Sequence, residues 1–87
     1  MSIQKMDETY DVAYPHAVTV ESYQTDDGDV RVTIERWSHD DYVVAGHIKH
    51  AGGRHGIWLG DTDARRNAES LDAARELVEV VAGSVTR

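Results

Sequence analysis

The spacing of apolar residues changes once along this chain, and the change limits the fold more than any other feature. Apolar and polar residues alternate through most of residues 18–59, as in strands with one buried face. From residue 71 onward apolar residues recur every three or four positions, as in an amphipathic helix. We therefore expect an α+β fold, in which an antiparallel meander of four to five strands carries one C-terminal helix packed on one face.

Length then limits the organisation to one domain. A chain of 87 residues without cysteine has room for one small core and forms no disulfide. We expect a single domain over residues 1–87, with the meander at 17–60 and the helix at 70–83. Residues 1–13 are expected to be flexible or an edge strand, the latter because Tyr10, Val12 and Tyr14 alternate. No apolar run suits a signal peptide or a membrane span, so we expect a cytoplasmic protein without a membrane partner.

The first predicted hairpin has two competing registers. A two-residue turn at residues 27–28 would place Ile34 opposite Glu21, which mixes apolar and charged side chains on one face. A three-residue loop over 26–28, with its glycine in the left-handed conformation, places Ile34 opposite Val20 instead. We prefer this second register because it collects one apolar face, made of Val18, Val20, Val30, Val32 and Ile34.

The second predicted hairpin turns at AGGR. Either a Gly52-Gly53 turn or a four-residue loop over 51–54 pairs His50 with His55 and Ile48 with Ile57. The expected core face of this hairpin consists of Tyr42, Val44, Ile48, Ile57 and Leu59.

The polar stretch 61–69 is expected to be a loop or a frayed first helical turn, with Thr62 as an N-cap candidate. Ser70 is the expected N-cap of the main helix, and Arg75 should pair with Glu79 one turn later. The apolar stripe of this helix consists of Leu71, Ala74, Leu77, Val78, Val81 and Val85.

One helix covers only one side of a sheet, so the other side carries the main functional prediction. Large apolar patches on small domains mark interfaces, and tryptophan is enriched among the residues that dominate binding energy. We predict that this helix-free side binds a protein partner or a second copy as a homodimer. The alternative is that the N-terminal segment folds over this side, or that a slipped register buries a tryptophan. The predicted contact residues are Tyr23, Trp37, Val43, Ala45, His47 and Trp58.

Three histidines around a glycine pair raise the question of a metal site. His47 and His50 point to opposite faces of a strand, because side chains alternate there. His50 and His55 would lie side by side, but a structural zinc site needs four ligands. We interpret these residues as histidines that flank a turn, and we predict no metal and no cofactor.

The other chemical motifs are incomplete. No serine lies in a G-x-S-x-G elbow, and GGRHG lacks the lysine and the spacing of a phosphate loop. The paired aspartates at 26–27 and 40–41 are at predicted turns, so we predict that the chain is not an enzyme. A net charge of −7 and the lack of a basic stripe argue against direct binding of nucleic acid.

The segment SLDAARELVEVVAG after a strand-rich body resembles the closing helix of short orphan proteins of high-GC bacteria and their phages. The match lies in Leu71, Ala74, Arg75 and Leu77, in the last third of the chain. The resemblance implies a regulator or inhibitor of a host protein. Two alternatives stay open: an acidic mimic of nucleic acid that blocks a DNA- or RNA-binding protein, and a small metal or ligand carrier that uses His50 and His55.

Overall fold

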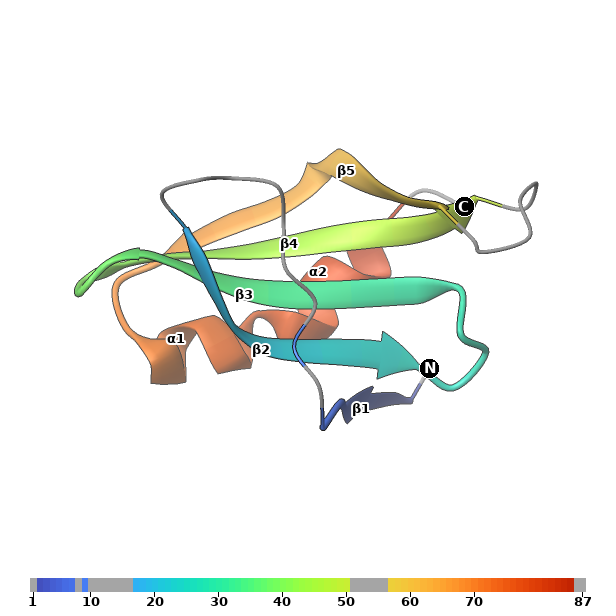
Figure 1. The fold of residues 1–87 in the computed structure, drawn as a ribbon, viewed down its shortest axis with the longest axis horizontal. Helices are drawn as coiled ribbons and strands as arrows, with labels where there is room; N and C mark the ends of the chain where they lie inside the picture. Colours follow the sequence, from blue (N-terminus) through green and yellow to red (C-terminus); the bar gives the residue numbers. More distant parts are fainter. Residues whose placement is uncertain (1, 8, 10–16, 51–56, 86–87) are drawn as a thin grey trace.

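Five strands form one antiparallel sheet whose spatial order follows the chain, and two short helices pack on one face of it (Figure 1). The computed structural model describes residues 2–7, 9, 17–50 and 57–85. This arrangement confirms the predicted α+β meander with a C-terminal helical segment. The elements are β1 (Ile3–Lys5), β2 (Val18–Thr25), β3 (Val30–Ser38), β4 (Asp41–His50), β5 (Ile57–Ala68), α1 (Leu71–Glu76) and α2 (Val78–Ser84).

The core lies between the sheet and the two helices. Alternate residues of β3 face the helices and are fully buried, as the alternation in the sequence predicts. Burying one such valine or isoleucine side chain stabilises the fold by roughly 1.5 to 3 kcal/mol. The buried cluster consists of Val30, Val32, Ile34, Val44, Ala64, Ala68, Ala74, Val78, Val81, Ala82 and Val85.

Gly46 lets α2 approach β4 closely. A Cβ atom at this position would lie 2.6 Å from Cγ2 of Val85 and 2.9 Å from Cβ of Ala64. Both distances are shorter than carbon–carbon contact allows, and Cγ1 of Val81 on α2 would lie 3.2 Å away, so α2 and the residue that follows it can pack this close only against glycine.

The preferred register of the first hairpin is wrong. Strand β2 pairs Glu21 with Ile34 and Tyr23 with Val32, because the loop spans four residues, 26–29, and not three. The Thr25 hydroxyl accepts a hydrogen bond from the backbone N–H of Val30, which holds the first residue of β3 against the last residue of β2. The loop glycine does adopt the predicted left-handed conformation, with φ 77°.

The register of the second hairpin is shifted by two residues. His50 lies opposite Ile57 and Ile48 opposite Leu59, so the predicted His50–His55 pairing is wrong. Residues 51–56, which include His55, lie outside the described part of the chain. A shift of two residues keeps Trp58 and Leu59 on their predicted faces, because side chains in a strand alternate with a period of two.

Strand β5 continues through the polar stretch that was expected to be a loop or a helical turn. It ends at Ala68, so Thr62 lies in a strand and is not an N-cap. The pairing with β4 is irregular between Gly60 and Arg65, as at a β-bulge. Ala64, at the end of this irregular stretch, and Ala68, beyond it, belong to the core, which explains why a polar segment forms an edge strand.

The helical segment begins where predicted and is interrupted once. The Ser70 hydroxyl accepts a hydrogen bond from the Ala73 N–H at 3.1 Å, which confirms the N-cap. At Leu77 the helix tightens, since its N–H bonds to the Ala74 carbonyl, and α2 follows. Arg75 forms its ion pairs with Glu21 and Asp72, which corrects the predicted pairing with Glu79.

The N-terminal part contributes an edge strand at residues 3–5, before the alternating segment from which an edge strand was expected. Strand β1 pairs with the end of β2, with Gln4 opposite Gln24. The segment with Tyr10, Val12 and Tyr14 lies outside the described residues.

Candidate interaction surface on the helix-free face

The sheet face that points away from the helices is called here the helix-free face. Both helices lie behind the sheet in the view of Figure 1, so this face is turned toward the viewer. Strand registers place Arg31 beside His47, and Lys49 beside Trp58. The face includes Arg31, Thr33, Glu35 and Trp37 of β3, Val43, Ala45, His47 and Lys49 of β4, and Trp58 and Arg65 of β5.

The centre of the helix-free face is buried within the chain itself. Val43 and Ala45, two of the predicted contact residues, lie on this face but are only 8 % and 1 % exposed. A partner that docks on this conformation therefore contacts the residues around them. The alternative, that the N-terminal segment covers this face, involves a segment of which residues 8 and 10–16 lie outside the described part of the chain.

Tyr23 lies on the opposite side from its predicted position. Its side chain packs at the border of the helix-facing core, and its hydroxyl donates a hydrogen bond to Oε1 of Glu21 at 3.1 Å. Burial and the neighbouring charge of Glu21 raise the pKa of this hydroxyl. The physical reason is the longer loop, because a shift of one residue moves a strand's side chains to the other face.

Both tryptophans lie on the helix-free face, and each has a defined neighbour. The indole Nε1–H of Trp37 donates a hydrogen bond to Oε1 of Glu35 at 3.1 Å. The guanidinium carbon of Arg31 lies 4.0 Å from the ring centroid of Trp58, which is a cation–π contact. All four side chains come from β3 and β5, and the two tryptophans and Arg31 are half-buried.

Glu35 is a fully buried carboxyl group on this face. Burial raises its pKa, while the Trp37 hydrogen bond and the positive charge of Arg65 oppose the rise. Its second oxygen, Oε2, is buried and has no hydrogen-bond partner among the described residues. The same holds for the hydroxyl oxygens of Thr33 and Thr19, and Thr19 lies directly opposite Glu35. The interior of this face is thus polar and incompletely satisfied.

Positive charges from three strands converge around His47. Arg31 lies on β3, Lys49 on β4 and Arg65 on β5, where it pairs with Ala45. Burial lowers the pKa of His47, and the charges of Arg65 and Arg31 lower it further. The sequence showed no basic stripe because these residues are far apart along the chain; only the sheet brings them together. The Trp–cation patch is defined here as Arg31, Trp37, His47, Lys49, Trp58 and Arg65.

A second charged cluster lies on the helix side. Glu21 is nearly fully buried and accepts hydrogen bonds from Nε of Arg75 at 2.7 Å and from Nζ of Lys5 at 2.8 Å. The hydrogen bond from Arg75 makes the largest contribution in lowering the pKa of Glu21 to about 2, and Lys5 and Tyr23 add to it against the effect of burial. These ion pairs hold β1, β2 and α1 together.

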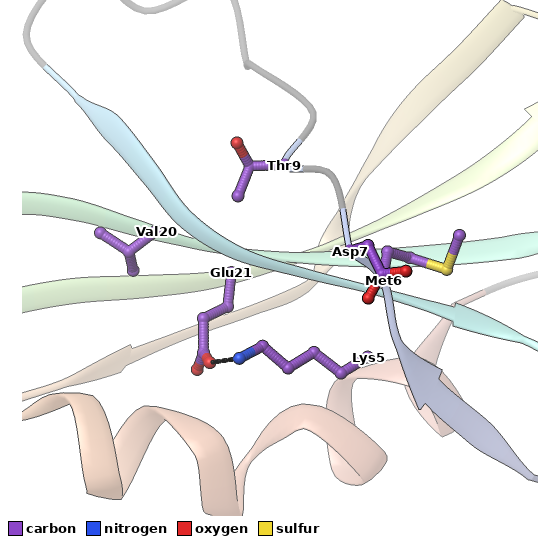
Figure 2. Close-up of a pocket in the computed structure, with 6 residues that line it drawn as sticks. All are labelled: Lys5, Met6, Asp7, Thr9, Val20 and Glu21. Atoms are coloured by element: carbon purple, nitrogen blue, oxygen red, sulfur yellow. Dashed lines mark ion pairs between the residues drawn. The ribbon is translucent and has the colours of Figure 1, made fainter.

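Figure 2 shows Lys5 and Glu21 meeting between β2 and the helices. A groove of about 420 Å³ opens beside them, lined by Lys5, Met6, Asp7, Thr9, Val20 and Glu21. A second depression of about 340 Å³ is lined by Lys5 together with residues of α1 and α2. Because the charges of Lys5 and Glu21 are paired with each other, this region is best explained as a structural tie between elements.

Within the described ranges, no group of three potential ligands could hold a metal ion. The side chains of His50 and His55 lie outside the description, so the structure does not bear on their metal binding. None of the described helices is long and apolar enough to cross a membrane. Comparison with protein-family models, with curated proteins and with solved structures finds no match to this chain.

Proposed function

We propose that this chain is a non-enzymatic interaction domain that binds a foreign protein through the Trp–cation patch. The observation that carries the proposal is the stacking of Arg31 on Trp58 at 4.0 Å, beside exposed Lys49. Tryptophan and arginine are the side chains most enriched among residues that dominate binding energy, and stacking fixes both before a partner arrives. The chain would act as a regulator or inhibitor in the cytoplasm, as its sequence suggested.

A foreign partner suits this patch better than a second copy. A twofold dimer buries the same surface on both chains, so residues near its axis meet their own copies. Arg31, Lys49 and Arg65 would then face like charges in a partly desolvated interface, which costs free energy. The homodimer expected from the sequence is therefore the less favoured form of the proposal.

The acidic-mimic function would use a different surface. The helical segment carries exposed acids, namely Glu69 beside its N-cap, Asp72 and Glu76 on α1 and Glu79 on α2, on the side away from the patch. Because the two surfaces are on opposite sides, single substitutions can separate the two functions.

The test uses the full chain as bait in an extract, with the Trp58→Ala and Trp37→Ala variants beside it. Val80→Ala is the matched control, because Val80 is an apolar side chain on α2 that is 52 % exposed. We expect the same protein to be captured by the unsubstituted chain and by Val80→Ala, and to be lost with Trp58→Ala. Capture that survives both tryptophan substitutions but is lost with Glu76→Gln and Glu79→Gln would favour the mimic instead.

A further inference from the structure

We infer that the partner presents an extended acidic segment to the Trp–cation patch, with carboxylates at alternate positions along the segment. This inference rests on the proposed function and names the chemistry of its partner. The patch gathers cations on an acidic chain: 16 acidic and 9 basic residues give a net charge of −7, yet three basic residues share one part of one face.

The spacing of the cations defines the segment. Along β4, Arg65 lies opposite Ala45, Arg31 lies opposite His47 on the other side, and Lys49 follows on β4 itself. These positions are two residues apart, so the three cations follow β4 over about 13 Å. An extended peptide projects every second side chain to one side with the same repeat. Carboxylates at its first, third and fifth positions would therefore meet the three cations in turn.

The arginine side chains of the patch are also suited to bind carboxylates. A guanidinium group offers planar, paired donors that match the two oxygens of a carboxylate. Arg31 is held over Trp58 and donates to Oε1 of Gln24 at 3.1 Å, so its position is defined by two neighbours. Holding the guanidinium in place lowers the entropy lost on binding.

Charge complementarity favours a short acidic segment over a nucleic acid. A phosphate backbone carries charge along its whole length and would run onto the acidic remainder of this chain, which repels it. A segment with only three or so carboxylates covers the patch and ends there. The ligand of the patch is therefore an acidic peptide segment of a protein.

The experiment measures fluorescence anisotropy of a short labelled peptide in which glutamate alternates with serine, titrated with the full chain. A peptide with glutamine in place of glutamate is the ligand control. Arg31→Gln and Arg65→Gln test the patch. Arg36→Gln and Arg66→Gln are matched controls, because these arginines lie on the same two strands but are exposed on the other face.

We expect the glutamate peptide to bind and the glutamine peptide not to bind. Each patch substitution should weaken binding roughly tenfold, the controls should change it less than about twofold, and binding should weaken as NaCl rises from about 50 to about 300 mM. Arg31→Lys guards against a folding defect in Arg31→Gln, because it keeps the charge and should retain most of the affinity.

Other results overturn the inference. Equal weakening by Arg36→Gln and Arg31→Gln would remove the patch as the site, and tighter binding of an oligothymidylate of equal length would replace a protein partner with nucleic acid. No peptide binding, combined with Trp58-dependent capture of a partner, would overturn the acidic chemistry alone. If neither peptide binding nor Trp58-dependent capture of a partner is found, the proposed function is overturned as well.

Discussion

At the scale of single residues, two buried glutamates show how environment decides the effect of burial. Glu21 faces Arg75 and Lys5, and its pKa falls to about 2 from the ordinary value of 4.5. Its contribution to stability is present above about pH 4.5 and is lost as the pH falls toward 2. Glu35 accepts a hydrogen bond from Trp37, and burial raises its pKa. Its contribution is present below about pH 4.5 and is lost as the pH rises through the folded-state value.

We therefore predict opposite effects of two isosteric substitutions. At pH 7, Glu35→Gln should leave the free energy of unfolding unchanged or raise it by about 1 kcal/mol, because it removes the cost of burying an ionisable carboxyl group and keeps an acceptor for Trp37. Glu21→Gln should lower the free energy of unfolding by roughly 1 to 3 kcal/mol, because Lys5 and Arg75 lose their ion pairs with this buried carboxylate. Urea unfolding of both variants at pH 7 and at pH 4 measures this.

The pH dependence of the stability difference between Glu35→Gln and the unsubstituted chain is the control for this prediction. Any gain from Glu35→Gln should vanish toward pH 4, where Glu35 itself is protonated in both states. A Glu35→Gln variant that is strongly destabilised at pH 7 would show that the carboxylate is ionised in the folded chain and is stabilised by a partner.

At the scale of elements, the packing of α2 against β4 depends on Gly46. We predict that Gly46→Ala lowers the free energy of unfolding by roughly 1 to 3 kcal/mol, because the new methyl group would collide with Val85 and Ala64. Gly83→Ala is the matched control. Its Cβ would meet nothing within 4 Å, so alanine should stabilise α2 by up to about 1 kcal/mol. Thermal or urea unfolding of the two variants tests this, and equal effects would contradict the close packing.

The element scale also shows how far the sequence predicts the fold. The change in apolar period predicted the meander and the helical segment correctly, because these patterns are local. The first register failed because the hydrogen bonds of Thr25 favour a loop one residue longer. The polar half of β5 was missed because its core side chains, Ala64 and Ala68, are too small to give a period-two signal.

The candidate site was predicted in part, for the same physical reasons. Trp58 lies on its predicted face even though its hairpin is shifted, because the shift is two residues. Tyr23 lies on the face opposite to the predicted one, because the register of its strand differs by one residue from the predicted register. The burial of Glu21 could not be predicted, since its partner Arg75 is 54 residues away in the chain. The cations of the patch were missed because only strand pairing brings them together.

At the scale of the whole molecule, the cations of the patch and the exposed acids of the helical segment lie on opposite sides of the sheet. The helix-free face carries Arg31, Lys49 and Arg65, while the exposed acids of α1 and α2 lie on the other side of the sheet. Two copies could therefore meet in two ways. Pairing patch to patch opposes like charges and needs salt to screen them. Pairing patch to helices joins opposite charges and weakens as salt rises.

From this division we predict that the isolated chain is a monomer at both low and high ionic strength. Patch-to-patch pairing lacks a favourable electrostatic term, and the net charge of −7 opposes contact between whole molecules. Sedimentation velocity at micromolar concentration in about 30 mM and about 500 mM NaCl measures this. A dimer that forms only at high salt and is lost with Trp58→Ala would restore the homodimer through the tryptophan face. Association only at low salt that is lost with Arg31→Gln would show that a second copy's acidic helices occupy the patch, in place of a foreign protein.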